Sequence, residues 1–138
     1  MRKSHISFTA TFVSVLMAAS PAWADCSTKD LAGRYQLYAS WVDEGVYGWT
    51  RCILSVKDDG NIKNGTKCVD DDGFADTVTG GSLAITKTCL VTGRINTTDG
   101  DALIDHARFN LDRSILIGVG RDADTFSDAI ITFTAQRL

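Results

Sequence analysis

The feature that most constrains this chain is an alternation of apolar and polar residues with a period of two. In the clearest stretch, Leu31, Tyr35 and Leu37 occupy one phase, and Arg34 and Gln36 occupy the other. Successive side chains of a β-strand point to opposite faces, so the alternation predicts a strand with one buried face. Helical periodicity is confined to one possible turn at residues 27–31. We therefore expect an almost purely β protein.

Eight segments carry the β pattern. They are 31–41, 48–57, 61–69, 77–86, 88–95, 102–109, 114–120 and 129–137. Residues 77–95 keep one phase almost throughout, so they form either one long bent strand or two strands, and we favour a break near Lys87. All twelve glycines follow residue 24, and the only proline, Pro21, precedes it. A proline-free chain that is punctuated by glycine and rich in Thr, Ile and Val has a β composition.

The connections predict how the strands are arranged. In an antiparallel meander, successive loops fall at opposite ends of the sheet. Loops two, four and six are short, at 58–60, 87–88 and 110–113. Loops one, three, five and seven are long, at 42–47, 70–76, 96–101 and 121–128. The pattern predicts an eight-stranded antiparallel up-and-down barrel, closed at a short-loop floor and elaborated at a long-loop rim.

The first 24 residues have the pattern of a bacterial signal peptide. Arg2 and Lys3 precede an apolar run at 6–19, and residues 21–24 end in an A-x-A cleavage pattern. We expect cleavage there to leave one soluble domain at 25–138, secreted or periplasmic, with no apolar run long enough to span a membrane. Cleavage removes two of the 14 basic residues and none of the 17 acids, so the remainder is more acidic than the whole chain at −3. This balance disfavours nucleic acid as a partner.

All four cysteines lie in the exported part, which implies two disulfides. A turn at 59–61 between the second and third strands would place Cys52 directly opposite Cys68, close enough for a cross-strand bridge. Cys26 precedes the first strand and Cys89 opens the fifth, so both begin at the floor. We therefore pair Cys52 with Cys68 and Cys26 with Cys89.

Three features together resemble the calycin group of barrels, which includes the lipocalins, the avidins and the small secreted bacterial inhibitors of metalloproteases. They are the Gly33-Arg34-Tyr35 sequence at the head of the first strand, the up-and-down strands, and the terminal Arg137. In that group an aromatic residue of the first strand typically packs beneath an arginine of the last. The resemblance implies that Tyr35 and Arg137 make this contact, although Tyr35 stands where Trp is usual. It implies an architecture and transfers no ligand.

Catalysis has little support in the sequence, and we expect a protein that is not an enzyme. A serine or cysteine hydrolase needs a histidine beside its nucleophile, and His106 is the one histidine after residue 24. A two-carboxylate glycosidase needs acids at a set separation across a cleft, and a zinc site needs clustered His and Cys. A small hydrolase that uses rim carboxylates therefore ranks last among the alternatives.

Acidic residues concentrate in the four long loops, which hold eleven of the 17 acids. Two of these loops share the pattern D-x-D-x-F-x-D, at 70–76 and 122–128. Carboxylates at such spacing outline an oxygen cage for Ca²⁺, but the EF-hand pattern is not met. Asp side chains also form turns and keep a secreted protein soluble. We expect no cofactor and at most weak Ca²⁺ binding.

Large aromatic residues share the rim with these acids, where they either cap the core or form a recognition surface. We expect a non-catalytic binding module whose rim holds a cationic or amphipathic small molecule or protein. The expected contact residues are Trp41, Asp43, Glu44, Tyr47, Trp49, Asp72, Phe74, Asp76, Asp122, Asp124, Phe126 and Asp128. A cavity in the barrel would favour a small ligand, and a filled barrel with exposed aromatic residues would favour a protein. An unpaired first or last strand would favour the alternative of a subunit in a surface assembly or filament.

Overall fold

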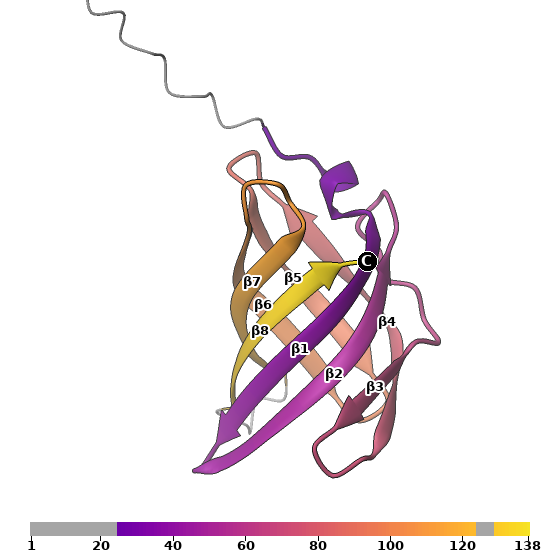
Figure 1. Cartoon of the computed structure of the whole chain (residues 1–138), viewed down its shortest axis with the longest axis vertical. Coiled ribbons are helices and arrows are strands. Elements are labelled where there is room, and N and C mark those ends of the chain that lie inside the picture. The colour runs from indigo at the N-terminus through magenta and orange to yellow at the C-terminus, as the bar shows by residue number, and fades with distance from the viewer. Residues whose placement is uncertain (1–24, 124–128) are drawn as a thin grey trace, which may run out of the picture.

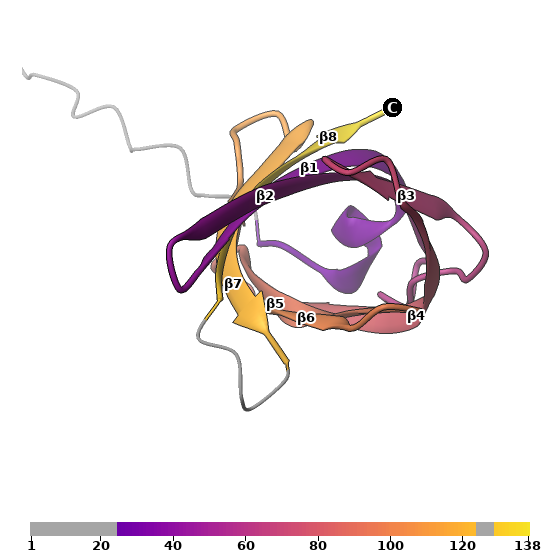
Figure 2. The same ribbon diagram turned by 90° about the horizontal axis from the view of Figure 1, so that it is seen from below.

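The computed structural model describes residues 25–123 and 129–138 as a closed, eight-stranded antiparallel barrel in up-and-down order (Figures 1 and 2). The strands are β1 (Gly33–Asp43), β2 (Val46–Val56), β3 (Lys67–Asp70), β4 (Ala75–Ile85), β5 (Leu90–Thr97), β6 (Asp101–Phe109), β7 (Ile115–Asp122) and β8 (Ile130–Arg137). The predicted all-β meander is therefore confirmed. The 77–95 region is two strands, β4 and β5, as the favoured break near Lys87 predicts. The architecture is compatible with a calycin-like barrel.

The period-two pattern corresponds to the inner and outer walls of the barrel. Along β1, Tyr35, Leu37 and Ala39 are buried, whereas Tyr38 and Ser40 are exposed. The other strands continue this inner layer, so the core is a single apolar filling. Among the described residues no polar or charged residue is buried as a whole.

One end of the barrel, the floor, is closed by a short 3₁₀ helix, η1 (Thr28–Leu31). Viewed from the opposite end, η1 lies behind the barrel opening (Figure 2). Its Leu31 is buried, and the Tyr35 hydroxyl donates a hydrogen bond of 2.9 Å to the Leu31 carbonyl. The Arg137 guanidinium lies 5.4 Å from the Tyr35 ring centroid and donates to its hydroxyl at 2.7 Å. The contact that the resemblance implies between the first and last strands is present.

Both expected disulfides are present. Cys52 and Cys68 are directly opposed on β2 and β3, with Cα atoms 4.1 Å apart. Cys26 joins Cys89 across a Cα–Cα distance of 5.1 Å, which ties the segment before η1 to the turn between β4 and β5. The first bridge joins two neighbouring strands on the buried side of the sheet, and the second joins two segments at the floor.

The third strand is shorter than predicted. The expected tight turn at 58–60 is present, because Val56 bridges to Ile62 and the Lys57 amide donates to the Asn61 carbonyl at 2.9 Å, but it lies in a longer connection between Val56 and Lys67. Asn61 bridges to Ser82, and the Ile62 amide donates to Gly81 on β4. Residues 63–66 then bulge before β3 begins. Beside the turn, Val56 faces Ile62, two residues short of the predicted register, and the bulge restores that register at Cys52 and Cys68.

The predicted contrast between long rim loops and short floor loops is wrong, although successive connections do alternate between the two ends. We keep the name rim for the end that carries the β1–β2, β3–β4, β5–β6 and β7–β8 connections. The first of these is only Glu44 and Gly45, with φ of 45° and 84°. Positive φ at both positions defines a type I′ turn, whose twist matches that of the strands and lets them pair up to it. The longest fully described connection lies at the floor, between β2 and β3.

Candidate binding rim

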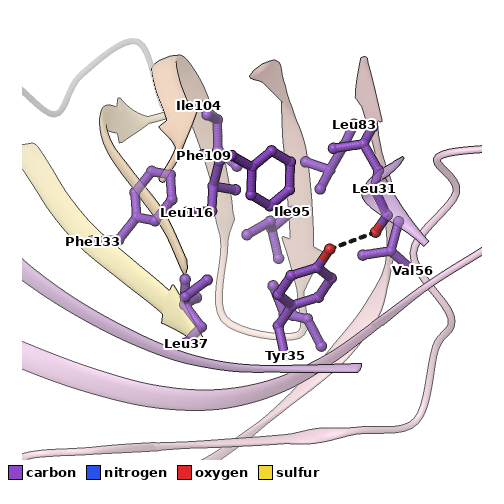
Figure 3. Close-up of a pocket in the computed structure, with 12 residues that line it drawn as sticks. Leu31, Tyr35, Leu37, Val56, Leu83, Ile95, Ile104, Phe109, Leu116 and Phe133 are labelled. Carbon is purple, nitrogen blue, oxygen red and sulfur yellow. Dashed lines mark hydrogen bonds between the residues drawn. The ribbon is translucent and has the colours of Figure 1, made fainter. Parts of the chain in front are cut away.

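The barrel interior is filled by side chains. The space between the core side chains measures about 20 Å³ (Figure 3). Its walls are aliphatic and aromatic and include Leu31, Leu37, Leu83 and Phe133, and the Tyr35 hydroxyl is engaged by the Leu31 carbonyl. A space of this size holds about one water molecule, whereas small-molecule sites enclose roughly 300–1,000 Å³. The interior therefore has no room for a ligand of ordinary size.

An open depression of about 410 Å³ lies outside the barrel near the floor. Lys57, Ile62, Lys63, Asn64 and Thr79 line it. It lies where residues 63–66 bulge between the 58–60 turn and β3. These residues stay bonded to β4, because the Gly65 amide donates to the Val78 carbonyl at 2.8 Å and the Val78 amide donates to the Thr66 carbonyl at 2.9 Å. Its lysines are exposed, and it is far along the strands from the acidic rim.

The β1–β2 hairpin carries five of the predicted site residues, and the structure divides them by face. Trp41 points inward and covers Gly48, where an added Cβ would lie 2.0 Å from the indole ring. Tyr47 and Trp49 point outward and are 74% and 48% exposed. Glu44 is exposed in the turn itself, and Asp43 is half-buried beside it. Trp41 therefore lies over Gly48 on the inner face of the hairpin, whereas Tyr47 and Trp49 lie on its outer face.

The β3–β4 connection carries the next group, and two of its carboxylates serve the turn. Asp70 Oδ1 accepts a hydrogen bond of 2.8 Å from the Phe74 amide. Asp76 Oδ1 accepts hydrogen bonds from the Thr77 amide at 2.6 Å, the Thr98 amide at 3.0 Å and the Thr98 hydroxyl. Burial raises the pKa of Asp76, but these hydrogen bonds together with the Thr97 hydroxyl outweigh it and hold the pKa below 3.8. Asp76 therefore joins two rim turns and is not presented to a partner.

Asp72 differs from Asp70 and Asp76 because its side chain is exposed. Phe74, in the same turn, is exposed as well. The Phe74 side chain is 73% exposed, so it does not tuck under the rim. The Asp71 amide donates to the Trp49 carbonyl at 3.1 Å, which brings this turn against the β1–β2 hairpin. The structure therefore places Tyr47, Trp49 and Phe74 on the same side of the rim as Asp71 and Asp72. Asp71 was absent from the predicted contact set, although it stands within the same acidic run.

The remaining predicted residues are in and around the β7–β8 connection. Asp122 is half-buried at the end of β7, opposite Ala102. Asp124, Phe126 and Asp128 lie outside the described residues. Two other acids near this side have partners: Asp101 lies 3.7 Å from Arg94, and Asp105 lies 3.2 Å from Arg121. Among the described residues, the rim acids that are exposed to solvent are Glu44, Asp71, Asp72 and Asp99.

Within residues 25–123 and 129–138, no group of three or more His, Cys, Asp or Glu side chains is arranged to hold a metal ion. In the first D-x-D-x-F-x-D loop, Asp70 and Asp76 are engaged by backbone amides, which is the turn-forming role that competes with Ca²⁺. Most of the second loop lies outside these ranges, so the expectation of weak binding stays a prediction.

In the described part of the chain, no helix is long and apolar enough to cross a membrane. No protein family model matches the sequence, and a comparison with curated proteins finds no match.

Proposed function

We propose that this chain is a non-catalytic, secreted binding module that holds a cationic or amphipathic protein at its acidic, aromatic rim. The observation that supports a protein over a small molecule is the filled interior combined with exposed aromatic side chains. Tyr47 and Phe74 are 74% and 73% exposed, and Trp49 is 48% exposed. The Trp49 carbonyl accepts a hydrogen bond from the amide of Asp71, and the side chains of Asp71 and Asp72 are exposed. Aromatic residues supply most of the energy of many protein interfaces, and a field of one sign speeds the encounter with a partner of the other.

Two further features support this proposal. Two disulfides fit an oxidising compartment, in agreement with the signal peptide expected at residues 1–24. The contact of Tyr35 with Arg137 supports a calycin-type barrel, a group that includes small secreted protease inhibitors. A filament subunit has less support, because β1 and β8 pair with each other from Tyr35–Arg137 to Val42–Ile130. Over that length, neither the first nor the last strand has a free edge to which another chain could add a strand.

The test compares two matched pairs of charge neutralisations. Asp71→Asn with Asp72→Asn removes two exposed carboxylates from the rim, and Asp25→Asn with Asp58→Asn removes two exposed carboxylates away from it. The partner is captured from the exported protein fraction at low and high salt and is quantified by mass spectrometry. We expect the rim pair to weaken capture about tenfold, and added salt to weaken the wild type in the same direction. Asp59 and Asp112 are unsuitable controls because each accepts hydrogen bonds within its own turn.

Folding is checked by thermal unfolding of each variant. Removing two like charges from a crowded rim should leave the melting temperature unchanged or raise it. Capture that survives in the rim pair and is lost in the Asp25–Asp58 pair would place the binding face at the other end of the barrel and reject the proposal.

A further inference from the structure

The barrel is closed, but β2 is longer than its neighbour β3. β2 runs from Val46 to Val56, whereas β3 pairs only with Thr50, Arg51 and Cys52. One further backbone hydrogen bond, from the Asp71 amide to the Trp49 carbonyl, ends the contact on that side. In Figure 1 the β1–β2 and β3–β4 hairpins diverge from this point toward the rim. The segment Val46–Trp49, which we call the β2 edge, therefore has β1 on one side and no described strand on the other.

The hydrogen-bonding direction of each residue in the β2 edge follows from antiparallel geometry. Backbone groups of successive residues point alternately to the two neighbouring strands. Because the Trp49 carbonyl points toward β3, the amide and carbonyl of Tyr47, two residues away, point to the same side. In the register with β1, Val46 faces Asp43, Tyr47 faces Val42 and Gly48 faces Trp41. By the same alternation, the backbone groups of Val46 and Gly48 bond to β1 and those of Tyr47 do not. The Tyr47 amide and carbonyl are therefore presented to solvent as one donor and one acceptor of a sheet ladder.

The surroundings of the β2 edge specify what can bind there. Tyr47 and Trp49 stand on its outer face, and Phe74 is exposed on the turn that borders it. Glu44 lies at one end of the edge, and Asp71 and Asp72 lie at the other. Tyr47 has an open backbone, and carboxylates flank both ends. This combination fits an extended peptide with basic side chains near its ends and apolar side chains between them.

We propose that the β2 edge receives an extended, basic segment of a partner protein as an added strand, in line with β3 and antiparallel to β2. The inference rests on the proposed function, which it deepens by naming the form and chemistry of the bound segment. Main-chain hydrogen bonds to Tyr47 fix the register of the segment. The aromatic side chains bind its apolar positions, and the carboxylates select its charge.

The probe for the test is a phage-displayed library of short random peptides, selected on the disulfide-bonded protein. We expect enriched peptides to alternate apolar with polar residues and to carry Lys or Arg near their ends. One enriched peptide is then synthesised unmodified and with alternate backbone amides N-methylated. N-methylation in the phase that faces β2 should abolish binding, whereas methylation in the other phase should leave most of it, because only one phase of a strand bonds to a given neighbour.

The protein side is tested by comparing Tyr47→Pro with Tyr47→Ala. Both variants lose the aromatic ring, but only proline also loses the amide that faces the open side. Because position 47 does not bond to β1, proline should be tolerated there, which thermal unfolding checks. We expect the alanine variant to bind the peptide about tenfold more weakly than wild type, and the proline variant to lose about a further tenfold.

Three outcomes would overturn the inference. Equal affinity of the alanine and proline variants would mean that binding does not use the strand edge, and failure to enrich any peptide would mean that no such segment is held. A concentration-dependent dimer that Tyr47→Pro dissolves would make a second copy of the chain the occupant. If partner capture still depends on Asp71 and Asp72 in any of these cases, the rim proposal stands without strand addition. If partner capture does not depend on them, both the rim proposal and the strand-addition proposal fail.

Discussion

At the scale of single residues, the rim carboxylates divide into two roles that sequence position does not distinguish. Asp70 and Asp76 accept backbone hydrogen bonds within their own region, and Asp59 and Asp112 do the same at the floor. In each case the carboxylate compensates for amides that a tight turn leaves without a ladder partner. Asp72, in the same short run as Asp70, is exposed. Only exposed acids such as Asp72 can bind a partner without breaking hydrogen bonds that stabilise the fold.

The structural role of Asp76 predicts a pH dependence of stability. Its folded pKa lies below the 3.8 of an ordinary aspartate, so its contribution is present above that value and is lost as pH falls through the folded pKa. Asp76→Asn should therefore lower the free energy of unfolding at pH 7 by about 1 kcal/mol, with little difference from wild type well below pH 3.8. Urea unfolding at the two pH values measures this. If the free energies of unfolding of wild type and variant differ by the same amount at both pH values, the charge of Asp76 does not contribute to stability.

At the scale of elements, the two disulfides act on different parts of the fold. Cys52–Cys68 joins neighbouring strands over a sequence separation of 16 residues, where the register already holds the two chains together. Cys26–Cys89 spans 63 residues and fastens the η1 segment to the β4–β5 turn. The Cys26 amide also donates to the Lys87 carbonyl at 3.2 Å, so the bridge reinforces a backbone contact. Cys26–Cys89 thus holds the floor covalently, whereas Cys52–Cys68 joins the β1–β2 hairpin to the β3–β4 hairpin where they are already paired.

Chain entropy predicts which bridge matters more. Replacing Cys26 and Cys89 by Ser should lower the free energy of unfolding by about 4 kcal/mol, and replacing Cys52 and Cys68 by about 3 kcal/mol. Urea unfolding of the two double variants gives the comparison, and peptide mapping without reductant checks the pairing in the wild type. A larger loss for the Cys52–Cys68 pair would mean that the entropy of the unfolded chain does not dominate. A mapped Cys52–Cys89 link would contradict the strand arrangement itself.

At the scale of the whole molecule, closure and filling of the barrel decide what kind of site the protein can have. Inward residues from all parts of the barrel, among them Leu37, Ile104 and Phe133, meet in one core around a space of about 20 Å³. Trp41 extends this packing toward the rim by lying over Gly48. A binding function must then use the outside of the barrel, where the overhang of β2 interrupts an otherwise continuous sheet.

The filled core predicts that the wild type binds no apolar molecule in its interior and that a cavity can be created there. Phe133→Ala should lower the free energy of unfolding by about 3–5 kcal/mol and leave an apolar space that is large enough for a benzene-sized molecule. Benzene binding is measured by calorimetry on both proteins, with Tyr38→Ala on the outer wall as the control. Strong binding by the wild type would show that its core opens in solution.

Much of the architecture follows from local pattern. The alternation that begins at Leu31 predicts which side of β1 is buried. Counting residues about a turn at 59–61 correctly opposes Cys52 to Cys68, although the observed turn alone would oppose Cys52 to Thr66 and the bulge at 63–66 supplies the two-residue shift. The candidate site was predicted less well. Trp41, Tyr47, Trp49 and Phe74 lie at the expected end. The contacts of Trp41 and Asp76 and the open side of Tyr47 depend on neighbours that are not next to them in the chain.

The sequence by itself determined the strand periodicity, the meander, the disulfide pairing and the concentration of acids at one end. These properties depend on side-chain alternation and on short-range spacing, which are readable along the chain. Only the tertiary structure decided where the strands end relative to one another, and therefore that β3 stops short and leaves the β2 edge beside Tyr47 open. Strand length is a compromise between pairing, twist and the packing of the complete barrel. No single segment of the sequence contains that balance.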